Sequence, residues 1–443
     1  MKPTTFIAGL AAFTFAATAY ADVVVDITGA TAFRAATLLS IRSQFNASGV
    51  AYKFAHDQTS GGGTVYSGAT RSIWIGTFPG VTGTTTIRTS FNGSVEGIRA
   101  LVDSPTSDPT YYQSSLLAST TAAVGGAEIF AQGTTGAAAA QSEIAFSDVS
   151  KAITPFAASS LQPSSPAVGV VVFTMLTNEG STVSNVTAQQ FRALMSNGFQ
   201  PLSVFSGNAA DVTNVFATGR NDGSGTRSSY LSETGFGVST PVKQYVTNTS
   251  TSNTLTTIQL VPAGGVFDND PLTAGVQPAG QLAANASTVW GSNIAGNGGY
   301  SSGSTLRTDM GKTGVAVTVF DENGDDAFGG TVRADLVAWL SLNDAVTARG
   351  NGAVFCGYNG VKLNDIAASG STMSAADKAK VTEGTYTAWN YQQMYRRNDI
   401  TSGDVVTVYN GIKGAIPTNL GAAGISLTDM HVSRPSDGGI VAP

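Results

Sequence analysis

The chain has 443 residues, of which 42% are hydrophobic and only 12% are charged, and its formal net charge is −6. A chain of this length exceeds one ordinary domain and predicts a core divided between two. The hydrophobic content is that of a packed protein and argues against disorder. The acidic balance and the lack of any basic run exclude an ordinary nucleic-acid-binding protein, which needs clustered Lys and Arg.

The first 21 residues have the pattern of an export signal. Lys2 precedes an apolar run that closes on Ala19-Tyr20-Ala21, a small-x-small pattern that suits cleavage before Asp22. The run is too short and too rich in Ala and Thr for a membrane span, which needs about 20 predominantly apolar residues. We therefore expect a periplasmic or extracellular protein that begins at Asp22 and has no membrane span. Loss of Lys2 brings the net charge to −6 − 1 = −7.

Cysteine and histidine are scarce. Cys356 is the single cysteine, so no intrachain disulfide can form, and we expect it to act as a small buried hydrophobic residue. His56 and His431 have no soft ligand at metal-binding spacing, so we expect neither a metal site nor a cofactor. The shortage of histidine also argues against a hydrolase with a His-activated nucleophile.

Short apolar runs alternate with helical periodicities, which predicts an α/β class. Strands are expected at 23–27, 84–91, 144–146, 168–176, 212–219 and 314–320. Helices are expected at 33–45, 95–102, 187–198 and 332–342. The third of these helices opens on the capping box Thr187-x-x-Gln190, and the last rests on the spacing of Val332, Leu336 and Leu340. The Gly/Ser/Thr-rich stretches 58–70, 104–140 and 246–306 are expected to form surface loops or small strands.

Three of these units share one design, in which an apolar strand leads through a turn of Gly, Ser and Thr into a helix. The first turn of a helix has unpaired backbone N–H groups and partial positive charge, so several such turns that converge would bind an oxyanion. A single turn of this kind is more often an ordinary helix cap.

The turn at 220–226, Arg-Asn-Asp-Gly-Ser-Gly-Thr, has the strongest chemistry of these turns. Arginine can grip an oxyanion through two parallel hydrogen bonds, and the glycines let the anion approach the backbone. The structural alternative is a polar turn in which Arg220 and Asp222 pair only with each other.

This turn resembles the R-x-D-G-S-G-T signature of periplasmic phosphate-binding proteins, the receptors of phosphate ABC importers. Other motifs of that family have counterparts in the same order along the chain. They are Gly29-Ala30-Thr31, Gly93-Ser94 with Gly97-Ile98, Phe146-Ser147-Asp148, Gly296-Asn297-Gly298-Gly299 and Thr313-Gly314-Val315. The sequence departs from the family at Ala32-Phe33, where Phe-Pro is usual, and at Val95-Glu96, where small residues are usual.

The resemblance implies a type II periplasmic-binding-protein fold, with two α/β lobes around a ligand cleft. It implies 22–166 and 313–443 for lobe one and 167–312 for lobe two. The anion would be bound by Thr31, the backbone of Ala32, Ser94, Asp148, Arg220, Ser224, Gly225 and Thr226. Asp222 would pair with Arg220 and orient it.

The expected function is therefore capture of inorganic phosphate or a related oxyanion, without catalysis, for delivery to an ABC importer permease. Two alternatives stay open. One is a phosphate-ester hydrolase that uses the same anion pocket, and the other is a secreted surface or structural protein that has kept the fold but lost the ligand.

Overall fold

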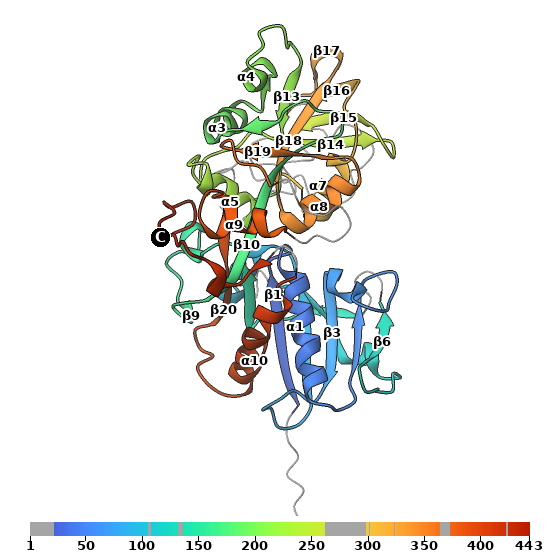
Figure 1. Ribbon diagram of the computed structural model, residues 1–443. Helices are drawn as coiled ribbons and strands as arrows, with labels where there is room; N and C mark the ends of the chain where they lie inside the picture. Colours follow the sequence, from blue (N-terminus) through green and yellow to red (C-terminus); the bar gives the residue numbers. More distant parts are fainter. Residues whose placement is uncertain are drawn as a thin grey trace, which may run out of the picture.

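The computed structural model describes residues 22–104, 108–131, 136–261, 298–300, 302–322, 324–363, 373–421 and 424–443. The predicted signal peptide, 1–21, lies outside the described residues. The chain forms two α/β lobes, and two strands run between them: β10 (Ala167–Thr177) and β20 (Trp389–Arg397) (Figure 1).

Strand β10 connects the lobes because it is one apolar run, Ala-Val-Gly-Val-Val-Val-Phe-Thr-Met-Leu-Thr, buried along nearly its whole length. Its first half pairs antiparallel with β20, up to Val172 opposite Trp389. Its second half pairs with β18 (Ala334–Ser341), from Phe173 opposite Ser341 onwards. A strand buried on both faces is expected to read as a continuous hydrophobic run.

Lobe one contains a mixed sheet in the order β10-β20-β8-β1-β4-β3-β2-β6. Its other strands are β1 (Val23–Gly29), β2 (Lys53–His56), β3 (Arg71–Gly76), β4 (Thr85–Ser90), β6 (Ala127–Phe130) and β8 (Ile144–Ser147). Strand β1 is parallel to both its neighbours, β4 and β8. The carboxyl ends of these three strands therefore meet at one edge of the sheet.

Helices cover both faces of this sheet. They are α1 (Arg34–Ala47), α2 (Ser94–Val102) and α10 (Asp404–Asn419). Strand β8 shows the division, because successive side chains of a strand point to opposite faces. Ile144 and Phe146 belong to the cluster under α1 and α10, and Ala145 packs with Ile98 and Leu101 of α2.

Lobe two contains the path β12-β13-β18-β10, with β19 and β11 beside it, and a separate sheet in the order β14-β15-β16-β17. The strands are β11 (Asn185–Val186), β12 (Phe199–Pro201), β13 (Asn214–Ala217), β14 (Tyr245–Ser250), β15 (Leu255–Leu260), β16 (Val317–Phe320), β17 (Asp326–Val332) and β19 (Val354–Tyr358). The helices are α3 (Ala188–Asn197), α4 (Ser203–Ser206), α5 (Gly225–Glu233), α7 (Gly303–Met310), α8 (Leu342–Gly350) and α9 (Ala375–Thr382).

Smaller elements complete the chain. They are β5 (Thr110–Tyr112), β7 (Ala137–Ala139), β9 (Leu161–Gln162), β21 (Gly424–Ile425) and the 3₁₀ turns Val65–Gly68, Ser114–Leu117, Lys151–Ile153 and Leu427–Asp429. The described parts of the Gly/Ser/Thr-rich stretches thus contain short strands as well as loops, and residues 262–297 lie outside the described residues. Within the described residues, no helix is long and apolar enough to cross a bilayer.

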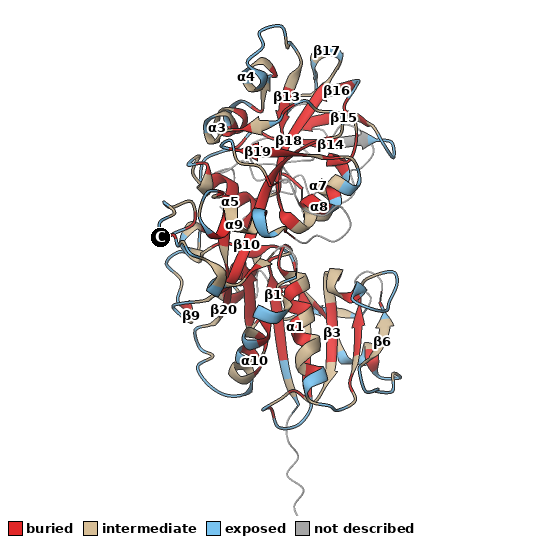
Figure 2. Ribbon diagram, viewed as in Figure 1, coloured by how far each residue is buried: buried red, intermediate tan, exposed pale blue. Residues whose placement is uncertain are grey.

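Most predicted elements are confirmed. The helix after Thr187 has the full capping box with Gln190 and stops at Gly198, as the sequence indicates. The helix predicted over 332–342 is wrong, because this segment forms the end of β17 and all of β18. All eight residues of β18 are buried between β13 and β10, so its run of apolar residues is that of a central strand (Figure 2).

The predicted return to lobe one at residue 313 also needs correction. Strand β16 pairs with β15, and β18 pairs with β13, so both belong to lobe two. Trp339 of β18 packs against Phe173 and Phe191 in the core of this lobe. The chain returns to lobe one along β20, which begins at Trp389.

Candidate interlobe anion site

The lobe-one side of the site is built where β1 ends and α2 begins. Gly29 has φ 117° and its carbonyl accepts a hydrogen bond of 2.9 Å from Gly93 N. Gly97 packs against the same turn, because a Cβ there would lie 2.5 Å from Gly29 Cα. Glycine at these positions therefore lets the turn after β1, which carries Thr31, lie directly beside the start of α2.

Ser94 and Asp148 form a buried pair on this side. The Ser94 hydroxyl donates to Asp148 Oδ1 and accepts a hydrogen bond of 3.1 Å from Asp148 N. Ser94 is the first residue of α2 and does not cap the helix with its side chain. Burial raises the pKa of Asp148 to about 6, although the Ser94 hydrogen bond and the charge of Arg220 act in the opposite direction.

The lobe-two side consists of the 220–226 turn, which leads from β13 into α5. Arg220 is buried, and its Nε donates a hydrogen bond of 2.8 Å to the carbonyl of Tyr300. Gln244 Nε2 donates to the Arg220 carbonyl at 3.0 Å. Ser224 precedes the first turn of α5 without a side-chain cap bond, and Thr226 lies within that turn, buried like Ser224.

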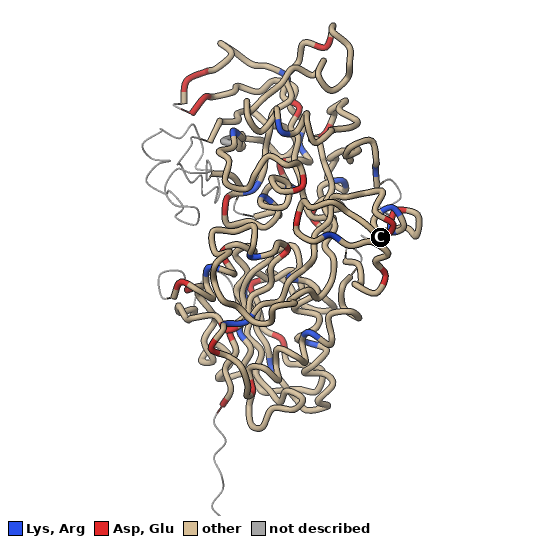
Figure 3. The backbone as a smooth tube through the Cα atoms, turned by 90° about the vertical axis from the view of Figure 1, so that its left-hand side faces the viewer, with Lys and Arg blue, Asp and Glu red and all other residues tan. Residues whose placement is uncertain are grey.

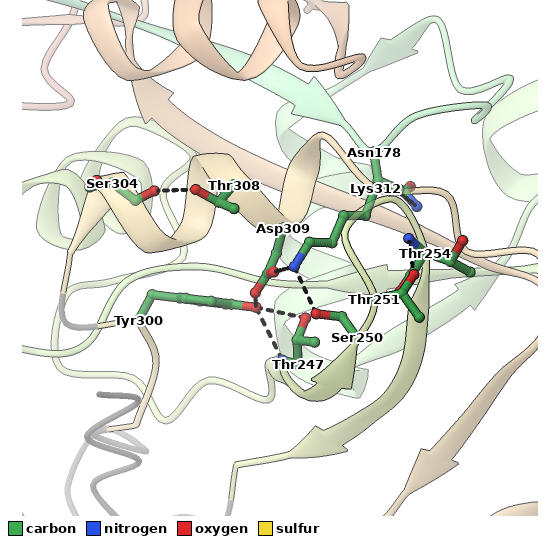
Figure 4. A network of polar contacts seen from close by, with 10 residues as sticks. All are labelled: Asn178, Thr247, Ser250, Thr251, Thr254, Tyr300, Ser304, Thr308, Asp309 and Lys312. Carbon is green, nitrogen blue, oxygen red and sulfur yellow. Dashed lines mark hydrogen bonds and ion pairs between the residues drawn. The ribbon is translucent and has the colours of Figure 1, made fainter. Parts of the chain in front are cut away.

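Tyr300 is itself held by a buried polar network (Figure 4). Its hydroxyl lies 2.8 Å from Asp309 Oδ2 and accepts a hydrogen bond of 3.0 Å from Thr247 N. Lys312 Nζ donates to Asp309 Oδ1 and to Ser250 Oγ, both at 2.7 Å. This network fixes the backbone that positions the Arg220 side chain.

The two sides meet directly at Gly225. A Cβ on Gly225 would overlap Asp148 Oδ1 and would lie 2.5 Å from Ser94 Oγ, so only glycine fits at this approach. The amides of Val95 and Glu96, at the start of α2, donate hydrogen bonds of 3.1 and 3.3 Å to the carbonyl of Gly223. These two amides therefore form hydrogen bonds between the lobes and cannot donate to an anion in this arrangement.

Arg220 lies among charges from both lobes. Burial lowers the pKa of Arg220 to about 10, and Arg34 lowers it further, whereas Asp344 and Asp148 raise it. Arg34 starts α1 in lobe one, and Asp344 lies in the first turn of α8 in lobe two. Two guanidinium groups that repel each other across a cleft are stabilised by an anion between them.

A cavity of about 300 Å³ lies at this place between the lobes. Thr31, Ala32 and Arg34 line it from lobe one, and Arg307, Asn343 and Asp344 line it from lobe two. Thr31 and Ala32 are thus at the cavity, while Ser94, Asp148 and Gly225 form the closed contact between the lobes.

The sequence did not single out Arg34, Arg307 and Asp344. One signal was available for Arg34, because a cation at the first position of a helix opposes the helix dipole and needs a compensating reason. Arg307 and Asp344 had no signal of this kind, since their ion pair of 2.8 Å joins two helices far apart in the chain.

Burial shifts the pKa of two further residues, Glu96 and Cys356. Glu96 lies in the first turn of α2 with its side chain 26% exposed, 3.5 Å from Arg99, and it packs against Gly223. Burial raises the pKa of Glu96 to about 6, and the charge of Asp222 adds to this rise. Cys356 is buried, as predicted, and burial raises the pKa of its thiol to about 11. The pairing of Asp222 with Arg220 stays a prediction.

Charged residues are sparse along the backbone, and both signs are mixed over the two lobes (Figure 3). Among the described residues, no group of three or more His, Cys, Asp or Glu side chains is placed to hold a metal ion.

No family model matches the chain, and no curated protein matches it. Several solved structures are similar to the chain. A substrate-binding protein assigned to a phosphate ABC transporter of Clostridium perfringens, with bound phosphate, is 11% identical at a TM-score of 0.43, over 91% of this chain and 99% of that chain. An ABC-type phosphate transport receptor from Vibrio cholerae is 12% identical at a TM-score of 0.42, over 91% and 99%.

A phosphate-binding protein from Stenotrophomonas maltophilia is also similar, at 12% identity and a TM-score of 0.34, over 92% of this chain and 91% of that chain. The chain is a two-lobed α/β protein similar to solved receptors for phosphate.

Proposed function

We propose that the chain is an exported solute-binding protein that captures a phosphate-type oxyanion between its lobes, without catalysis. The observation that supports this most is that Arg220 and Asp148, two buried and opposite charges from different lobes, lie close enough to shift each other's pKa beside the interlobe contact at Gly225. A buried charge is costly unless a partner compensates it, so such a pair at a cleft is a good candidate for a binding site.

Groups from both lobes would bind the anion. Arg220 supplies the main positive charge and two parallel hydrogen bonds, and Thr31 and the backbone of Ala32 bind from lobe one. Ser224, Gly225 and Thr226 donate from the start of α5. Because these groups come from both lobes, the ligand would stabilise the closed arrangement.

Asp148 would select phosphate over sulfate. Phosphate still carries a proton near neutral pH and can donate a hydrogen bond to the carboxylate. Sulfate has no proton to donate, so Asp148 would face it as a repelling acceptor.

Delivery of the ligand to an ABC importer permease, and a periplasmic or extracellular location, belong to the same proposal. They rest on the motif resemblance and on the predicted signal before Asp22.

The test is a calorimetric titration of phosphate into refolded, ligand-free wild type and the Arg220→Ala variant. Hydrogen bonds to a charged group contribute about 1.5–3 kcal/mol each, so the loss of two should weaken binding by about a hundredfold or more. Arg42→Ala removes the same charge from an arginine on α1 that bonds Gly63 and is the matched control. Equal affinity for phosphate in wild type and both variants would show that Arg220 does not belong to the binding site.

A further inference from the structure

The cavity between the lobes is larger than a phosphate ion needs. It has a volume of about 300 Å³ and begins at Thr31 and Ala32, beside the proposed anion site. Inorganic phosphate has only a handful of heavy atoms, whereas pockets for small organic molecules begin at about this volume. The cavity therefore has room for a ligand that extends beyond the phosphoryl group.

The polar lining of the cavity suits an uncharged, hydroxylated group. Arg307 Nη1 donates to Asp344 Oδ1 at 2.8 Å, and Ser341 Oγ donates to Asp344 Oδ2 at 3.2 Å. These bonds fix the Asp344 carboxylate, whose remaining lone pairs can accept from ligand hydroxyls. The amide of Asn343, beside it on α8, can both donate and accept. A carboxylate on the ligand would be repelled by Asp344.

Arg34 adds positive charge to the lining of the cavity. Within the described residues its Nη1 donates one long hydrogen bond, 3.4 Å to Thr70 Oγ1, and Arg34 lies close enough to Arg220 to lower the pKa of that guanidinium. An arginine whose bonds are this weak has hydrogen-bonding capacity left for a ligand. Apolar side chains, Leu39 and Leu420, line another part of the cavity and suit carbon atoms of the ligand.

We propose that the natural ligand is a phosphomonoester of a small hydroxylated compound, such as a polyol or sugar phosphate, and that inorganic phosphate is the weaker ligand. The phosphoryl group binds Arg220, Arg34 and Thr31, and the hydroxylated group binds Asn343 and Asp344. This inference rests on the proposed function.

The experiment compares three probes by calorimetry: inorganic phosphate, glycerol 3-phosphate and glucose 6-phosphate. At least one ester should bind about tenfold or more tightly than inorganic phosphate, the gain expected from one or two added hydrogen bonds. Thr347 is exposed on α8 and lines the cavity, so Thr347→Trp should fill it without disturbing the core. This variant should lose the ester preference and keep its affinity for inorganic phosphate.

Ser196→Trp places the same side chain on an exposed position of α3, outside the cavity, and is the control. Thermal unfolding of both variants shows that they are folded. If inorganic phosphate binds and neither ester binds more tightly, the inference is overturned and the proposed function stands. If no probe binds wild type, the proposed function fails and the inference fails with it.

Discussion

Asp148→Asn should stabilise the ligand-free protein above pH 6 relative to wild type. Burial raises the pKa of Asp148 from its ordinary 3.8 to about 6, so the folded state holds this proton over a pH range in which the unfolded chain has lost it. The contribution of Asp148 to the stability of wild type therefore falls as the pH rises from about 4 to 6, and the loss is complete above that range. At about 1.4 kcal/mol for each pH unit, this rise in pKa corresponds to about 3 kcal/mol.

The asparagine variant keeps an oxygen that can accept from Ser94 and carries no charge, so it lacks this loss. Urea unfolding of both proteins at pH 4 and pH 7.5 measures the effect as a difference. The raised pKa values of Glu96 and Glu143 do not depend on Asp148, so they are present in both proteins and cancel. The variant should gain about 2–3 kcal/mol on wild type between the two pH values. A difference that does not change with pH would refute the buried, charged state assigned to Asp148.

Three further results are expected. Gly225→Ala should prevent the lobes from meeting and weaken phosphate binding by about tenfold or more, because a Cβ there overlaps the opposite lobe. The control is Gly414→Ala on α10, which has open space around it and should leave binding unchanged. Glu96→Gln should tighten phosphate binding by about tenfold or less, because its partly exposed charge is screened, and a thousandfold gain would mean that the site repels phosphate. The intact mass of the exported protein should correspond to a chain that begins at Asp22, and a mass that includes 1–21 would contradict export.

Elements with a local signal could be predicted from the sequence. The helix after Thr187 is specified by a capping box and a terminal glycine, both within a few residues. The segment 332–342 had no such local signal at its ends. Its apolar residues recur at a helical spacing, and only its position between β13 and β10 makes it a strand.

The division into lobes shows the same limit. The family resemblance implied the two lobes and a first crossover at 167, and the continuous apolar run of β10 predicted the buried strand there. The second crossover lies at β20. Its sequence, Trp-Asn-Tyr-Gln-Gln-Met-Tyr-Arg-Arg, is polar and does not indicate a buried strand as that of β10 does. Its assignment depends on long-range pairing with β10 and β8.

The candidate site could be predicted only where residues belong to a short motif. The 220–226 turn and Ser94 follow this rule, and the structure places Gly225 of the turn against Ser94. Arg307 and Asp344 are 37 residues apart and become neighbours only through the packing of α7 and α8. No residue spacing in the sequence indicates such a pair.

The central claim is that a phosphate-type anion binds between the lobes. Titration of refolded, ligand-free wild type with phosphate and with sulfate tests it most directly. We predict one phosphate per chain and much weaker binding of sulfate, with most of this discrimination lost in Asp148→Asn. Absence of heat with phosphate and with its esters, in a protein shown to be folded, would contradict the claim and favour a surface protein that has kept the fold without a ligand.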